Sequence, residues 1–167
     1  MERRVGWAGW AAFVLGLLYA LVSAYWAAGG TAGLSTLGGT IEELGRARDP
    51  GLIAIVWVTA ALKLAVALAG LAVARPGPWR RPLRFVAWTA AVVLVSYGGL
   101  LVAGQAFVEA GLIDAAPGAN RSAIRWHLYL WDPWFLAWGL ALGAELLGSR
   151  RPDRERGGRP APGGAAA

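Results

Sequence analysis

Long apolar runs dominate the chain, and four of them are long enough to cross a membrane as helices. They cover residues 5–28, 51–74, 85–108 and 131–147, and the charged residues fall almost entirely between them. A helix needs about 20 apolar residues to cross the hydrocarbon core of a bilayer. The pattern therefore predicts an all-α integral membrane four-helix bundle, with residues 1–148 forming the transmembrane domain.

The second and fourth runs open on the same dipeptide, Asp49-Pro50 and Asp132-Pro133. Aspartate is favoured at the N-cap of a helix and proline at its first position. Both starts are expected on the outer side of the membrane. The simplest role for either aspartate is to accept hydrogen bonds from the free amides of the first helical turn.

Two short interfacial helices are expected on the outer side. Thr40 followed by Glu43 has the form of a capping box, which predicts a helix over residues 41–48. A second helix is expected over residues 120–131, leading into the last span through a bend at Pro133. Small residues recur every fourth position in the first span, a pattern that lets another helix approach closely. They are Ala8, Ala12, Gly16, Ala20, Ala24 and Ala28.

Composition and charge fix the class of protein and its expected orientation. The chain is 57% hydrophobic and 16% charged, too apolar for an ordinary soluble domain, and it has no cysteine for thiol or disulfide chemistry. Eleven arginines lie before the first span, between spans two and three, or after span four, and four lie in the other two loops. The positive-inside rule then predicts cytoplasmic termini. Residues 149–167, rich in Arg, Pro, Gly and Ala, are expected to form a disordered basic cytoplasmic tail.

Two charged residues interrupt the spans. Lys63 lies in the second span and Glu145 in the fourth, at similar distances from the two prolines. A charge at such depth is costly and therefore marks a functional or structural site. We expect an intramembrane ion pair between Lys63 and Glu145. The alternatives are a proton-linked site and separate snorkelling of each side chain toward water.

Tryptophans crowd the predicted outer interface around the only histidine of the chain. Trp26, Trp126, Trp131 and Trp134 have the composition of an aromatic pocket, and His127 lies among them. The simpler interpretation is an interfacial aromatic belt with a packed histidine. One histidine excludes a haem held by two histidines, and no ligand spacing indicates a metal, so no cofactor is predicted.

Several segments together resemble a known family. They are the outer loop YWAAGGTAGLSTLGGTIEELGRARDP, Leu62-Lys63, SYGGLLV and RWHLYLWDPWFLAWG. This combination is similar to domain-of-unknown-function family 3995, small four-helix bacterial membrane proteins without an established activity. The resemblance implies a bacterial inner-membrane protein. It also suggests a shared outer-face site around Trp26, Gly29, Gly30, His127 and Asp132.

The leading functional hypothesis is a non-enzymatic membrane protein whose outer-leaflet pocket receives a small amphipathic ligand, a lipid or a partner helix. One alternative is a small transporter or exporter that uses Lys63 and Glu145 and works as a homodimer. Another is an enzyme acting on a lipid or quinone. Nucleic acid is not an expected partner, because topology and anionic lipid explain the net charge of +6.

Overall fold

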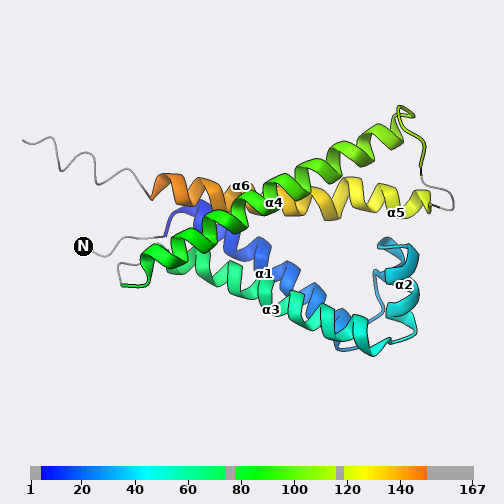
Figure 1. Ribbon diagram of the computed structural model, residues 1–167, viewed down its shortest axis with the longest axis horizontal. Coiled ribbons are helices and arrows are strands. Elements are labelled where there is room, and N and C mark those ends of the chain that lie inside the picture. The colour runs from blue at the N-terminus through cyan, green and yellow to red at the C-terminus, as the bar shows by residue number, and fades with distance from the viewer. Residues whose placement is uncertain (1–4, 74–77, 116–118, 150–167) are drawn as a thin grey trace, which may run out of the picture.

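The structure, a computed structural model, describes residues 5–73, 78–115 and 119–149, and all of its regular elements in these ranges are helical (Figure 1). The predicted all-α class is confirmed. The expected tail at 149–167 lies outside the described residues except for Ser149. The elements are α1 (Trp7–Ala27), η1 (Leu34–Thr36), α2 (Gly39–Arg46), α3 (Pro50–Ala72), α4 (Arg80–Glu109), α5 (Arg121–Trp126), η2 (His127–Trp131) and α6 (Asp132–Gly148).

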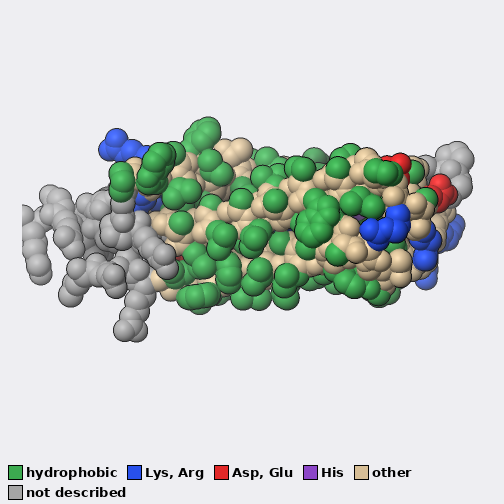
Figure 2. Space-filling model, turned by 90° about the horizontal axis from the view of Figure 1, so that it is seen from below, with side chains coloured by type: hydrophobic (Ala, Val, Ile, Leu, Met, Phe, Trp, Pro, Cys, Tyr) green, Lys and Arg blue, Asp and Glu red, His purple; other side chains and the backbone are tan. Residues whose placement is uncertain are grey.

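Three helices, α1, α3 and α4, are long and apolar enough to cross a membrane. The helix α6 has 17 residues and follows α5 and η2 without an intervening loop. Many large apolar side chains point away from the bundle, among them Ile55, Val58, Leu62 and Leu100. Figure 2 shows apolar side chains along the length of the helices and basic side chains gathered toward the ends. Such a surface suits lipid rather than water.

The helices pack in a fixed order. The helix α1 lies against both α3 and α6, and α4 runs along α6 (Figure 1). At one end of the bundle lie α2 and α5, which we call the outer end. At the other end, which we call the inner end, lie the start of α1, the start of α4 and the end of α6.

Asp49 starts α3 in the predicted way. Its Oδ1 accepts a hydrogen bond from the backbone N–H of Leu52 at 2.8 Å, and Pro50 occupies the first position of the helix. The short helix predicted in the preceding loop is α2. Its N-cap is Gly38, which has no side chain to offer, so the capping-box interpretation of Thr40 is wrong.

Asp132 is the first residue of α6 but does not cap it, so the predicted N-cap role is wrong. The helix starts a dozen residues earlier, where Asn120 Oδ1 accepts hydrogen bonds from the backbone of Ser122 and Ala123 at 2.9 and 3.4 Å. The chain then stays helical through η2, a π-helical turn, in which the backbone N–H of Asp132 donates to the carbonyl of His127. Asp132 therefore lies inside a continuous helix.

Glycines bring α6 close to its neighbours. A Cβ atom on Gly16 of α1 would lie 2.6 Å from the indole of Trp138. A Cβ atom on Gly98 of α4 would lie 2.6 Å from the backbone nitrogen of Leu136 and 3.0 Å from the carbonyl oxygen of Asp132. The backbone of α6 cannot move aside as a flexible side chain could. The fit of α4 against α6 therefore requires glycine at position 98.

We expect Gly98→Ala to lower the free energy of unfolding by about 1–3 kcal/mol, because the methyl group would press on the α6 backbone. Gly99→Ala is the matched control: its Cβ meets nothing within 4 Å, and alanine favours the helix by about 1 kcal/mol over glycine. Denaturant titration in detergent micelles measures both. Equal effects of the two substitutions would contradict the close approach at Gly98.

Candidate functional site

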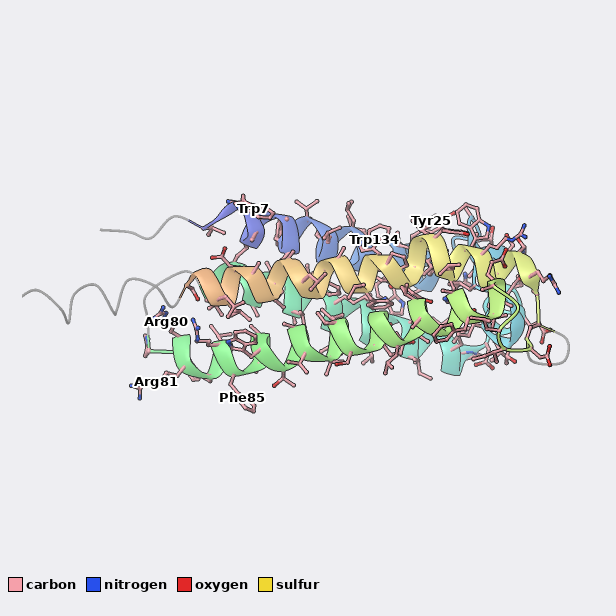
Figure 3. The ribbon with its side chains drawn as sticks, turned by 90° about the horizontal axis from the view of Figure 1, so that it is seen from above. Trp7, Tyr25, Arg80, Arg81, Phe85 and Trp134 are labelled. Atoms are coloured by element: carbon pink, nitrogen blue, oxygen red, sulfur yellow. The ribbon has the colours of Figure 1, made fainter. Side chains whose placement is uncertain are left out.

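Five aromatic side chains pack together between α1 and the continuous helix formed by α5, η2 and α6. The ring centre of Tyr19 lies 5.8 Å from that of Trp131, 5.2 Å from Trp134 and 4.6 Å from Phe135. Trp26 meets Trp131 edge-on at 5.4 Å. We call these five residues the aromatic cluster. Figure 3 shows Trp134 on the side of α6 that faces α1.

The indole N–H groups of the aromatic cluster all have partners. Trp26 donates to the carbonyl of Ala32 at 2.8 Å, and Trp131 donates to the hydroxyl of Thr36 at 3.0 Å. Trp134 donates to the carbonyl of Leu15 at 3.1 Å, inside the bundle. The aromatic cluster thus ties the outer loop to the helices through hydrogen bonds as well as ring packing.

The four tryptophans expected to wall an outer pocket lie in two separate places. Trp26, Trp131 and Trp134 pack against one another around Tyr19, and only 6% of Trp131 is exposed. Trp126 lies apart on α5, with 46% of its surface exposed. Tyr19 of α1 stacks on both Trp131 and Trp134.

Lys63 is held at the edge of the aromatic cluster. Its Nζ donates to the hydroxyl of Ser23 at 2.8 Å and lies 4.0 Å from the ring centre of Tyr19. It also lies 5.8 Å from the ring centre of Phe135. The electron-rich face of an aromatic ring attracts a cation, most strongly where water is excluded. These contacts give the charge of Lys63 a partner within the protein.

Glu145 has a different role from the expected one. Its Oε2 accepts a hydrogen bond from the backbone N–H of Gly9 at 3.1 Å, in the first turn of α1. A carboxylate at a helix N-terminus satisfies a free amide and complements the helix dipole. Glu145 of α6 therefore caps α1, whose own N-cap residue, Gly6, has no side chain to do so.

The structure does not bring Lys63 and Glu145 together. Lys63 contacts α1 at Ser23 and Glu145 contacts it at Gly9, which lie roughly 21 Å apart along the helix. The expected equal depth of Lys63 and Glu145 was wrong because Pro50 and Pro133 lie at different heights along the bundle. Pro50 starts α3 beyond the end of α1, whereas the residues around Asp132 already pack within the bundle.

Asp132 and His127 form the second polar pair near the aromatic cluster. Asp132 is 1% exposed, and its Oδ1 lies 3.2 Å from His127 Nδ1. Its other oxygen, Oδ2, is buried without a hydrogen-bond partner. The hydrogen bond to the Asp132 carboxylate raises the pKa of His127 above its ordinary value of 6.5; partial burial opposes the rise, and the backbone carbonyl of Leu37 adds to it.

The glycines of the outer loop leave room for neighbouring side chains. Gly29 has φ +108°, a backbone conformation that favours glycine, and the guanidinium of Arg48 occupies the place of its missing side chain. The ring of Tyr25 covers Gly30 in the same way, and the Tyr25 hydroxyl accepts from the N–H of Ala32 at 3.2 Å. Both glycines shape the loop next to the aromatic cluster.

An open hollow of about 310 Å³ lies at the outer end, between the start of α2 and the helix α5. Of the residues expected at an outer pocket, His127 lines it. The other lining residues are Leu37, Gly38, Gly39, Gln105, Ala119, Asn120, Ala123 and Ile124. The hollow therefore offers amide and imidazole groups beside short apolar side chains, and the buried Asp132 lies behind the imidazole.

Sequence reasoning missed Tyr19, Ser23, Gln105 and Asn120. Tyr19 and Ser23 are four residues apart on one face of α1, so a hydroxyl pair within an apolar span was the available signal. Gln105 and Asn120 lie on separate helices, and no local pattern links them. Only the packing of α4 beside α5 brings them to the same hollow.

These features define an all-helical protein with helices suited to a membrane and a polar site at one end of the bundle. Residues 5–142 match the family described as protein of unknown function DUF3995, and the chain belongs to that family. Comparison with curated proteins and with solved structures finds no match. The family membership confirms the resemblance seen in the sequence and assigns no activity.

The separation of Lys63 and Glu145 predicts independent energetics. In a double-mutant cycle, Lys63→Met and Glu145→Leu should add within about 0.5 kcal/mol, because the sites are distant and share no partner. The matched cycle of Lys63→Met with Ser23→Ala should show coupling, since these residues touch. Unfolding free energies measured in detergent test both cycles. Strong coupling between Lys63 and Glu145 would contradict their separation and support the ion pair.

The His127–Asp132 contact predicts a pH-dependent stability. Because the folded-state pKa of His127 is raised, its contribution is fully present below the unfolded pKa and is lost as pH rises through the folded value. The difference in unfolding free energy between the wild type and His127→Gln should therefore shrink from about pH 6 to pH 9. A difference that stays constant over this range would exclude a raised pKa.

Proposed function

We propose that the protein is a non-enzymatic, multi-pass membrane protein that binds a small amphipathic molecule at its outer end. Four helices would cross a bacterial inner membrane, with both termini in the cytoplasm. The distribution of arginines supports this orientation, and the apolar surface of the helices supports the membrane location. The hollow lined by His127 is the observation that carries the binding function.

The chemistry of the hollow suits a ligand with one polar end and a short apolar part. The side-chain carbonyl oxygen of Asn120 caps α5, and this fixes the orientation of the side-chain amide. Its NH₂ group is then the hydrogen-bond donor offered to a ligand. Gln105 faces the same hollow from α4, and Leu37 and Ile124 supply apolar surface. Binding sites for small molecules commonly combine apolar walls with a few oriented polar groups.

The hydrogen bond between His127 and Asp132 fixes the position of the imidazole that lines this hollow. His127 lies between the ligand space and the buried carboxylate, and its imidazole lies close to the Leu37 carbonyl as well. A ligand would therefore meet an imidazole ring whose position two other groups already fix. Such preorganisation lowers the entropic cost of binding.

A small transporter is the second candidate. Glu145, at the other end of α1, does not serve as its acidic residue. Lys63 lies over the ring of Tyr19, and Trp131, the residue before Asp132, packs on the same ring. The buried, unpartnered Oδ2 of Asp132 supports a proton-linked role, since ionisable groups within spans are usually functional. A homodimer would be expected, because the chain is short. An enzyme acting on a lipid or quinone has no comparable support.

Native mass spectrometry of the protein, extracted with its own membrane in polymer discs, tests the binding function. We expect a small molecule retained at defined stoichiometry by the wild type and lost from Ala119→Trp, which fills the mouth of the hollow. Leu112→Trp is the matched control, because Leu112 is exposed at the same end without lining the hollow. A bare wild-type monomer would contradict the proposal, and a bare homodimer would favour the transporter.

A further inference from the structure

A second hollow lies between α4 and α6, in the inner half of the molecule. It is a groove of about 350 Å³ whose lining is almost entirely apolar. The helices touch at Gly139, where a Cβ atom would lie 2.8 Å from Val95, and they leave space beside Gly143, where a Cβ atom would meet nothing within 4 Å. The groove faces the surroundings of the bundle, so in a membrane it opens toward lipid.

Arginines close the inner end of this groove. On α4, Arg80, Arg84 and Trp88 follow one another at four-residue spacing and therefore share the face that lines the groove. Arg84 donates to the Ser149 hydroxyl at 2.6 Å and to the Leu146 carbonyl at 2.9 Å. These bonds hold the basic side chains of α4 against the end of α6.

The basic end continues onto the surface. Arg80 Nη2 lies 3.5 Å from the carbonyl oxygen of Ser149, whereas Arg81 is exposed on the outward face that it shares with Phe85. Figure 3 shows Arg80 and Arg81 at the start of α4, with Phe85 pointing away from the bundle one turn further along. A site results that is cationic at one end and apolar along its length.

We propose that this groove binds one anionic phospholipid, with the phosphate at Arg80 and an acyl chain beside Gly143. The groove from Trp88 to Ser96 runs roughly 12 Å. This length is close to the roughly 15 Å of hydrocarbon in one leaflet. Trp88, at the end nearest the arginines, is the residue type that prefers the level of the headgroups.

Charge favours a lipid over a second copy of the chain. Two copies side by side in one membrane would bring their inner ends together, and these ends carry like charge. An apolar helix from another protein would fill the groove but would offer no anion to Arg80. A phospholipid satisfies both parts of the site, because its phosphate accepts from guanidinium groups and its chain is apolar.

Lipid titration followed by native mass spectrometry tests the assignment, with the protein delipidated in detergent. Phosphatidylglycerol and phosphatidylcholine of identical acyl chains are the two probes. We expect the wild type to prefer phosphatidylglycerol. Arg80→Gln should weaken phosphatidylglycerol binding roughly fivefold, the effect of one arginine near an anionic surface, and should weaken phosphatidylcholine binding less, because choline offsets the charge of its phosphate.

Three further variants distinguish binding in the groove from general attraction of lipid to a basic surface. Gly143→Leu fills the groove and should reduce the binding of both lipids, whereas Gly104→Leu, on α4 outside the groove and also with open space at its Cβ, should not. Arg46→Gln removes a basic residue at the outer end and should leave the preference intact. Equal binding of the two lipids by the wild type, or unchanged phosphatidylglycerol binding in Gly143→Leu, would overturn the proposal. Melting temperatures near that of the wild type establish that each variant is folded.

Discussion

The close approach of α6 to α1 and α4 determines the positions of Asp132 and of the tryptophans in the aromatic cluster. Gly16 admits the indole of Trp138 on one side, and Gly98 admits the backbone of α6 on the other. With α6 fixed between α1 and α4, Asp132 becomes buried and the tryptophans face Tyr19. Larger residues at these glycines would separate the helices and open the cluster that closes the outer end of the bundle.

Polar groups in an apolar surrounding need partners within the protein, and this chain supplies them across helices. Glu145 of α6 caps α1, Ser23 of α1 receives Lys63 of α3, and Trp134 donates to the Leu15 carbonyl. Each of these contacts joins two different helices. The same interactions that satisfy buried polar groups therefore also fix the register of the helices.

Hydrophobic pattern was sufficient to predict the helices, because length and polarity decide whether a segment suits a membrane. It was not sufficient to place the side chains relative to one another. Asp49-Pro50 and Asp132-Pro133 are identical dipeptides, yet the first begins a helix and the second lies inside one, since Asn120 had already started it. Counting from the two prolines consequently placed Lys63 and Glu145 at one depth. The depth of a residue depends on how far each helix extends, which is a property of the packed bundle.

The π-helical turn η2 has a consequence for how the two ends of its helix are related. A π turn accommodates one more residue than an α turn, so it shifts the angular phase of everything before it by about 100° relative to everything after it. The face of α5 that lines the hollow is therefore rotated relative to the face of α6 that meets α1. One inserted residue allows a single helix to serve a packed interior and an open binding surface that point in different directions.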